Sequence, residues 1–411
     1  MTDRFLLPKD PRLSLGMLLP SSRRRNVPAQ VSGSQTYYLF WARNAIYHSL
    51  RALKFKPGDN VLIPSYHCTS IVEPIRQYGT EVKFYNVGLD LKPDLSDIEG
   101  KIDPKTRGLL AIHYFGFPQP IISIRKFCLE RGLYLIEDCA HVLRGRTPEG
   151  IPLGTSGDIS IFSWRKFLPV YDGGQLVINN PALDLQNQWN TGGPLFALKI
   201  AKNLFDKLME DSSHVLFNRI ARLSHAPSVY FRRFACANGY GKSVSTVNSY
   251  DLDFDLGSAN LKMSRLSQYI VRNADIVDVA EKRRLNYRLL AKGVEGLPGV
   301  KPLHPSLPNY VVPWVFPLLA YGLENLHLRL RERGIPATNW SGVIHPSLPL
   351  DRFPDLRFLY DNLVFLPVHQ SLEKQELETM LFILREVLTQ RAAADAKSLD
   401  GGVPLSAVSG R

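Results

Sequence analysis

The chain has 411 residues, of which 45% are hydrophobic and 21% are charged, and its formal net charge is +12. This length and apolar fraction exclude a disordered or collagen-like chain and suit one large domain or two smaller ones. The four cysteines form no CxxC pair, which argues against a disulfide framework, and the scattered histidines predict no metal site.

The two ends of the chain differ in composition from the middle. Residues 1–36 are rich in Pro, Ser and Arg and predict an N-terminal arm, whereas residues 391–411 are small and polar and predict a disordered tail. No continuous apolar stretch resembles a signal peptide or is long enough to span a membrane, so we expect a cytoplasmic protein.

Short apolar runs alternate with helical patterns through the first half of the chain. Strands are predicted at 61–64, 82–87, 108–115, 133–137, 159–163 and 175–179, with helices at 70–78 and 121–131. Nearly continuous apolar strands separated by helices are typical of an α/β fold with a mostly parallel sheet sandwiched by helices. Ligands of such sheets bind beyond the carboxyl ends of the strands, so polar residues there are the best site candidates.

The pattern continues into a second, smaller unit. We expect a large domain at 37–250, with an insertion near 185–250 that holds an amphipathic helix at 197–209. A smaller C-terminal α/β domain is expected at 251–390. Its predicted elements are a helical stretch from 263 to 290, strands at 310–320 and 363–367, and helices at 323–333 and 372–389.

Three segments at strand ends carry the residues that favour a particular chemistry. Asp138 follows the strand at 133–137, Lys166 follows Ser163 at the end of the strand at 159–163, and Gly173-Gly174 permits a tight turn. Taken singly, Asp138 is equally compatible with a helix cap and Lys166 with a surface lysine. Taken together, a strand-end Asp and a strand-end Lys suit pyridoxal 5'-phosphate, whose aldehyde bonds to a lysine and whose ring nitrogen pairs with a carboxylate.

The sequence also resembles a known family in several segments that occur in order. The motifs for dinucleotides, nucleoside triphosphates and serine hydrolysis (GxGxxG, GxxxxGK[ST] and GxSxG) are absent. Between Tyr38 and Leu388 the chain is similar to the DegT-type sugar aminotransferase family, which consists of fold type I pyridoxal-phosphate enzymes. The segments are PGDNVLIPSYHCTS at 57–70, IDPKTRGLLAIHYFG at 102–116, IEDCAH at 136–141, GDISIFSWRKFLPVYDGG at 157–174, SANLKMS at 258–264 and NLVFLPVHQSL at 362–372.

The resemblance implies a role for each matching residue. Lys166 is the implied Schiff-base lysine and general acid/base, and Asp138 is the implied partner of the pyridine nitrogen. The other implied cofactor-binding residues are Arg43 and Asn44 at a helix start, Cys68 at the ring-stacking position, His141 near the ring hydroxyl, Ser163 at the phosphate, and Asn260, which reaches the phosphate from the neighbouring subunit. The last position implies a homodimer with shared active sites.

The resemblance further implies a transaminase that moves an amino group from an amino acid, L-glutamate in the family, to a nucleotide-linked keto-sugar for amino-sugar and polysaccharide biosynthesis. Two alternatives are a sugar dehydratase on the same fold, against which Lys166 argues, and a non-enzymatic regulatory protein. No motif indicates nucleic-acid binding. Cys68 stands where many relatives have an aromatic residue, and Lys262 where they have arginine, which indicates an outlying subgroup.

Overall fold

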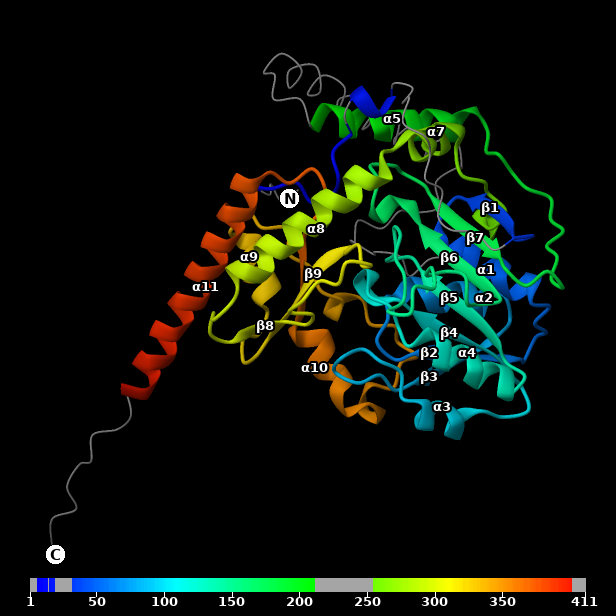
Figure 1. Cartoon of the computed structure of the whole chain (residues 1–411), viewed down its shortest axis with the longest axis horizontal. Coiled ribbons are helices and arrows are strands. Elements are labelled where there is room, and N and C mark those ends of the chain that lie inside the picture. Colours follow the sequence, from blue (N-terminus) through cyan, green and yellow to red (C-terminus); the bar gives the residue numbers. More distant parts are fainter. Residues whose placement is uncertain (1–5, 14, 19–31, 211–253, 401–411) are drawn as a thin grey trace, which may run out of the picture.

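The structure is a computed structural model in which residues 6–13, 15–18, 32–210 and 254–400 are described. Its centre is a seven-stranded sheet in the order β1-β7-β6-β5-β4-β2-β3 (Figure 1). The strands are β1 (Gln35–Leu39), β2 (Asn60–Pro64), β3 (Glu81–Tyr85), β4 (Thr106–Ile112), β5 (Tyr134–Cys139), β6 (Ile159–Ser163) and β7 (Gly174–Ile178). The five strands β2 to β6 pair in parallel, and β7 runs antiparallel to both β6 and β1.

Helices pack on this sheet, as the alternating pattern predicts. They are α1 (Ala42–Ala52), α2 (Val72–Gln77), α3 (Leu95–Lys101) and α4 (Ile121–Glu130). Strands β2, β6 and β7 are buried along their whole length, which explains why their apolar runs lack the alternation of a half-exposed strand. The expected fold class, a mostly parallel sheet covered by helices, is confirmed.

Strand β1, like α3 and the elements at Val300–Pro302 and Pro354–Asn362, is not predicted by the sequence pattern. It lies at the edge of the sheet, and only Leu39 of its five residues is buried, so its apolar signal is weak. Its pairing of Leu39 with Gly174 brings the start of α1 against the sheet. A Cβ on Gly174 would lie 2.2 Å from the carbonyl carbon of Trp41, so the glycine permits this close approach of two backbones.

The smaller unit is built on a three-stranded antiparallel sheet in the order β10-β9-β8. Its strands are β8 (Val300–Pro302), β9 (Val315–Ala320) and β10 (Leu363–Pro367), and its helices are α8 (Ile276–Gly293), α9 (Leu326–Glu332), α10 (Pro354–Asn362) and α11 (Lys374–Asp400). The helical stretch predicted from 263 to 290 is two helices, α7 (Arg265–Asn273) and α8. The break falls there because Asp275 caps α8, its side chain accepting a hydrogen bond from the Asp278 backbone N–H at 3.0 Å.

The predicted amphipathic helix is present as α5 (Pro194–Glu210). Ile200 and Leu204 from its apolar face are buried beside Ile270 and Val271 of α7. The remainder of the expected insertion, from 211, lies outside the described residues, and the domain boundaries at 250 and 390 stay predictions. Within the parts of the chain that the structure describes, no helix has the length and apolarity needed to cross a membrane.

Both chain ends differ from the sequence-based expectation. Residues 6–13 of the predicted arm are packed rather than loose, with Leu7 4% and Leu13 1% exposed. Helix α11 continues through Asp400, ten residues into the predicted tail. The physical reason for the second difference is that 391–397 (RAAADAK) consists largely of strong helix formers, which extend an established helix at little cost.

Buried histidines predict that the fold is sensitive to acid. Burial holds the pKa values of His48, His67, His304 and His369 at about 4, whereas an unfolded histidine titrates near 6.5. Between these values the unfolded chain binds more protons, so the free energy of unfolding falls as pH drops from about 6.5 to about 4. Each histidine contributes up to about 3 kcal/mol to this loss.

The measurement is urea unfolding as a function of pH, with His304→Phe as the test variant. The His304 ring stacks on Phe117 at 3.8 Å between ring centroids, and phenylalanine keeps that contact without titrating. We expect the variant to lose stability less steeply below pH 6.5. An unchanged slope would contradict the assignment.

Candidate active site

A cavity of about 420 Å³ opens at the carboxyl ends of β5 and β6, where the sequence places its chemistry-bearing residues. Its walls come from the ends of these two strands, the start of α1, the small unit and the N-terminal segment. The lining residues that carry polar or aromatic groups are Lys9, Asp10, Trp41, Arg43, Cys68, Ser70, Asp138, His141, Ser163, Arg165, Lys166, Trp314 and Trp340. Six of the eight predicted site residues therefore meet in one place.

Asp138 is the buried carboxylate of this cavity. It is the fifth residue of β5 and is 4% exposed, and its Oδ1 accepts a hydrogen bond from the Ala140 backbone N–H at 2.8 Å. Burial raises the pKa of the Asp138 carboxyl above its ordinary value, and the Ala140 N–H and the charge of Lys166 oppose that rise. A buried carboxylate is costly without a cationic partner, so the position suits a group that brings a protonated nitrogen.

Lys166 stands on the neighbouring strand end. It closes the short 3-10 helix η4 (Trp164–Lys166) directly after β6, and the turn is held by a hydrogen bond from the Trp164 backbone N–H to the Gly173 carbonyl at 2.7 Å. Its ammonium nitrogen Nζ lies 4.3 Å from the ring centroid of Trp314. Because β5 and β6 are adjacent and parallel, Asp138 and Lys166 line the same cavity.

His141 lies in an aromatic stack above the strand ends. Its ring is 4.2 Å from the Trp314 ring, with an interplanar angle of 24°. The Phe115 backbone N–H donates to Nδ1 at 3.2 Å, which assigns the ring proton to Nε2. Burial and the charge of Lys166 hold the pKa of His141 well below its ordinary value, so the ring is neutral and offers an N–H donor.

The start of α1 and the end of β6 offer a place for an anion. Trp41 caps α1 without a side-chain hydrogen bond, no acidic residue occupies the first turn, and Ala42 and Arg43 line the cavity. Arg43 is 6% exposed, and its guanidinium lies 4.4 Å from the centroid of the Trp41 ring. Ser163 brings a hydroxyl to the same cavity. Helix N-terminal amides, a hydroxyl and an arginine are the groups that bind phosphate.

Cys68 lines the cavity, but neither neighbouring aromatic residue takes over its predicted stacking position. Tyr66 is fully buried, with its ring 4.9 Å from that of Trp340. The His67 ring stacks on Phe84 at 5.3 Å, away from the cavity. The aromatic surface of the site is supplied instead by His141 and by tryptophans.

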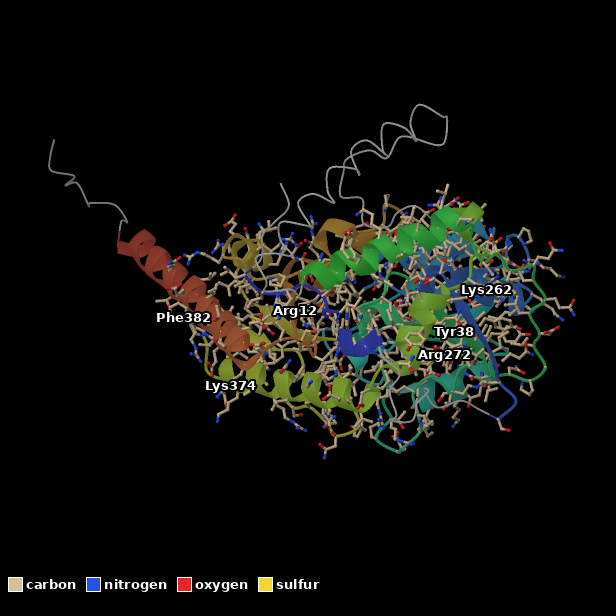
Figure 2. All side chains as sticks on the ribbon, turned by 90° about the horizontal axis from the view of Figure 1, so that it is seen from above. Arg12, Tyr38, Lys262, Arg272, Lys374 and Phe382 are labelled. Atoms are coloured by element: carbon tan, nitrogen blue, oxygen red, sulfur yellow. The ribbon has the colours of Figure 1, made fainter. Side chains whose placement is uncertain are left out.

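Two predicted residues do not line this cavity. The side-chain amide of Asn44 donates to the backbone carbonyls of Ser258 at 2.7 Å and Ala259 at 3.1 Å, so this side chain anchors that segment. The expected place of Asn44 at the phosphate stays a prediction. The Asn260 side chain accepts a hydrogen bond from Asn187 at 2.8 Å, and its expected reach into a neighbouring subunit stays a prediction. Lys262, labelled in Figure 2, does not line the cavity either, although it forms a β-bridge with Leu39, two residues before Trp41.

Several lining residues were missed by the sequence reasoning. Trp314 and Trp340 come from the small unit, and Lys9 and Asp10 come from the N-terminal segment. The one signal in the sequence that could have found the tryptophans is that this residue type is rare: the chain has five, and three of them, including Trp41, line this cavity. No sequence pattern placed residues so distant along the chain beside Lys166.

One cluster of His, Cys and carboxylate side chains occurs among the described residues, but its His and Glu side chains already make hydrogen bonds within the protein. His113, Glu137 and Cys139 place their ligand atoms within 4.8 Å of one another. Glu137 accepts hydrogen bonds from His113 Nε2 at 3.0 Å and from the backbone N–H groups of Gly154, Ser156 and Gly157. The other His113 nitrogen accepts from the Gln119 N–H, so the cluster is a structural hydrogen-bond centre behind the site.

A larger cavity of about 710 Å³ lies between the loop after β5 and the start of α8. Arg284 lines this cavity and donates to the backbone carbonyls of Pro308, Asn309 and Val311, so its side chain holds the loop at 308–311. The cavity of about 420 Å³ combines a buried carboxylate, a lysine and a helix start suited to anions, and it is the candidate active site.

The fold is a mostly parallel α/β sheet covered by helices, and Asp138 and Lys166 line one cavity at its strand ends. Residues 42–189 match the model of the DegT/DnrJ/EryC1/StrS aminotransferase family, which agrees with the resemblance seen in the motifs.

Individual relatives agree with this assignment. The chain is 35% identical over 157 residues to GDP-perosamine synthase of Vibrio cholerae, a match that covers 36% of this chain and 42% of that protein. It is 33% identical over 156 residues to dTDP-4-dehydro-2,3,6-trideoxy-D-glucose 4-aminotransferase of Saccharopolyspora spinosa, which covers 37% and 40%. The matched part thus spans about two fifths of these curated relatives.

Solved structures show the same fold over a larger share of the chain. The aminotransferase PseC of Helicobacter pylori superposes with a TM-score of 0.61 at 14% identity, covering 87% of each chain. The aminotransferase TlmJ of Streptoalloteichus hindustanus gives a TM-score of 0.59 at 19% identity, covering 87% of this chain and 86% of that one. These likenesses confirm the fold of both units.

Proposed function

We propose that this protein is a cytoplasmic pyridoxal 5'-phosphate-dependent aminotransferase that moves an amino group from an amino acid to a keto-sugar for amino-sugar and polysaccharide biosynthesis. The observation that carries the proposal is that Asp138 and Lys166, from adjacent parallel strands, line one cavity beside an anion-binding helix start. L-Glutamate is the expected donor, and the names of both curated relatives favour a nucleotide-linked acceptor.

The residues present fit the cofactor. Asp138 is a buried carboxylate with a raised pKa, which a protonated ring nitrogen would relieve. The start of α1 and Ser163 would hold the phosphate, and His141 Nε2–H would donate to the ring hydroxyl. When bound, the cofactor supplies an electron sink that stabilises negative charge on the substrate carbon next to nitrogen.

The protein's own part in the reaction falls to three groups. Lys166 would bond covalently to the cofactor at rest and then, as a free amine, move a proton between carbon atoms. Asp138 would keep the ring nitrogen protonated. Trp314 and Trp340 would close the cavity from the side of the small unit and reduce the access of water.

We also propose a homodimer with shared active sites. Asn260 is only partly buried and does not line the cavity of its own chain, which agrees with a role in the site of a second copy. Because the cavity lies beside the segment 258–262 that Asn44 anchors, association through this face would join two such sites. Sedimentation at micromolar concentration tests the dimer.

Reconstitution of the purified protein tests the proposed function. We expect the protein to turn yellow with pyridoxal 5'-phosphate, to lose that colour when L-glutamate is added, and to release one 2-oxoglutarate per site. A panel of GDP-, dTDP- and UDP-linked keto-sugars should then restore the colour, with the aminated sugar detected by mass spectrometry. A protein that takes up no cofactor contradicts the proposal, and a dehydrated sugar in place of an aminated one would identify the alternative reaction.

A further inference from the structure

The described N-terminal residues 6–13, here named the N-terminal strap, run along the small unit and reach the large unit at Leu13, which packs in one cluster with Leu143 and Phe167. Figure 1 shows the strap passing beside α8, and Figure 2 places Arg12 between α11 and the rest of the molecule. The strap lies against the candidate active site, although in sequence it is more than 150 residues from Lys166. Its position raises the question of what it contributes there.

The first residues of the strap are held by hydrogen bonds to the small unit. The Leu6 backbone N–H donates to the Gly334 carbonyl at 2.8 Å, and His369 Nε2 donates to the Pro8 carbonyl at 2.9 Å. A Cβ at position 334 would lie 2.6 Å from the Leu6 side chain, so the strap is packed tightly against the turn at Gly334. Leu7, the second residue of the strap, is buried.

The last residues of the strap are held by the small unit as well. The Arg12 backbone N–H donates to Ser371 Oγ at 2.9 Å, and the Arg12 guanidinium pairs with Glu376 at 3.2 Å. Pro11 and Leu13 are buried. Between these anchors only Lys9 and Asp10 are exposed, so the strap presents two charged side chains at a fixed place.

Lys9 and Asp10 line two cavities that share Lys166 and Trp314. One is the 420 Å³ active-site cavity, and the other is a side cavity of about 110 Å³ backed by Arg283. The charged residues around the active-site cavity of 420 Å³ are four cationic ones, Lys9, Arg43, Arg165 and Lys166, and two acidic ones, Asp10 and Asp138. This cationic excess favours anionic ligands. Lys166 and Arg43 already have places in the proposed chemistry, whereas Lys9 does not.

We propose that the N-terminal strap is part of the substrate site, with Lys9 binding an oxyanion of a substrate at the mouth of the cavity. This inference rests on the proposed function for its choice of substrates. The oxyanion is either a carboxylate of the amino donor or a phosphate of the nucleotide-linked acceptor, since a lysine ammonium pairs with both. The carboxylate of the neighbouring Asp10 repels anions, so the negatively charged group of the substrate would bind on the Lys9 side.

The test compares Lys9→Met and Lys9→Arg with Lys126→Met. Lys126 is an exposed lysine on α4, with 79% of its side chain accessible and no place in either cavity. In steady-state assays we expect Lys9→Met to raise KM about tenfold or more for one substrate, with a smaller change in kcat, and Lys9→Arg to restore most of the affinity. A rise for the donor identifies a carboxylate, and a rise for the acceptor identifies a phosphate. Values within twofold of wild type for both substrates would overturn the proposal.

A binding measurement keeps this test separate from that of the proposed function. Calorimetric titration with inorganic pyrophosphate and with 2-oxoglutarate needs no turnover. We expect wild type and Lys126→Met to bind at least one of these probes and Lys9→Met to bind it about tenfold more weakly, with the difference shrinking as salt is added. Equal binding by wild type and Lys9→Met, or no binding of either probe by wild type, would overturn the proposal even if the enzyme proves active.

Discussion

Replacing Lys166 by alanine is expected to abolish covalent attachment of pyridoxal 5'-phosphate and to lower kcat by at least about a thousandfold. The physical reason is that the cavity loses both the amine that bonds to the cofactor and the base that moves the proton. Asp138, Ser163 and the start of α1 remain, so the variant should still bind the cofactor without a covalent bond.

The measurement is borohydride reduction followed by peptide mass spectrometry. The adduct should map to Lys166 in wild type and be missing from Lys166→Ala. Lys9 is the matched control, because it lines the same cavity and a second lysine could in principle react there. Lys9→Ala should retain the adduct. Partial rescue of Lys166→Ala by added small amines would separate a missing amine from a damaged fold, and a variant with activity within tenfold of wild type would refute the assignment.

Replacing Arg283 by methionine is expected to produce the second-largest effect, on both stability and turnover. Arg283 is 1% exposed and donates to the backbone carbonyls of Trp314 at 2.9 Å, Lys166 at 3.3 Å and Phe167 at 3.4 Å. It also donates to Gln370 at 2.9 Å. Burial lowers the pKa of Arg283 to about 9, so the guanidinium still carries its charge at neutral pH. One side chain of α8 thus positions both the lysine and its tryptophan neighbour.

Methionine fills a similar volume but donates no hydrogen bond. We expect a loss of about 2–4 kcal/mol in the free energy of unfolding, because several buried carbonyls lose their donor while the cost of burying a charge is relieved. Turnover should fall about a hundredfold, since a displacement of Lys166 by about 1 Å is enough for such a loss. Cofactor affinity should change much less, which separates positioning of Lys166 from damage to the cavity.

Arg284→Met is the matched control for this prediction. Arg284 is the next residue on α8, but it holds the 308–311 loop through backbone carbonyls, on the side of the larger cavity. Its loss should leave kcat within about twofold of wild type. A folded Arg283→Met variant with unchanged kcat would show that Arg283 supports the fold without positioning Lys166.

Much of the large unit could be predicted from the sequence because its strands are apolar throughout. The predicted strands at 61–64 and 159–163 match β2 and β6 within one residue, since a strand buried on both faces leaves an uninterrupted signal. Edge strand β1 gave no such signal. The small unit was harder. The strand predicted at 310–320 begins only at Val315, because the backbone just before it bonds outside the sheet: the Trp314 N–H donates to the Phe115 carbonyl at 2.9 Å.

The candidate site divides in the same way. The carboxyl ends of the neighbouring parallel strands β5 and β6 carry Asp138, Ser163 and Lys166. Their positions directly after apolar runs are visible in the sequence, so their closeness could be predicted. The direction of the Asn44 side chain could not be predicted, because a helix start points some side chains into the cavity and others away; its amide donates to the carbonyls of Ser258 and Ala259. The helix pattern indicated that α1 begins here but not which way its first turn faces.

The sequence by itself predicted the type of fold from its local apolar patterns, and the resemblance of its motifs to a known family singled out Asp138 and Lys166 at strand ends. Only the tertiary structure decided that Trp314, Arg283 and the N-terminal strap surround Lys166. Those contacts join segments that are distant along the chain through backbone carbonyls, aromatic rings and single hydrogen bonds, which leave no periodic trace in a sequence. The excess of positive charge, visible from composition alone, thereby acquires a place in the site through Lys9, Arg43 and Arg165.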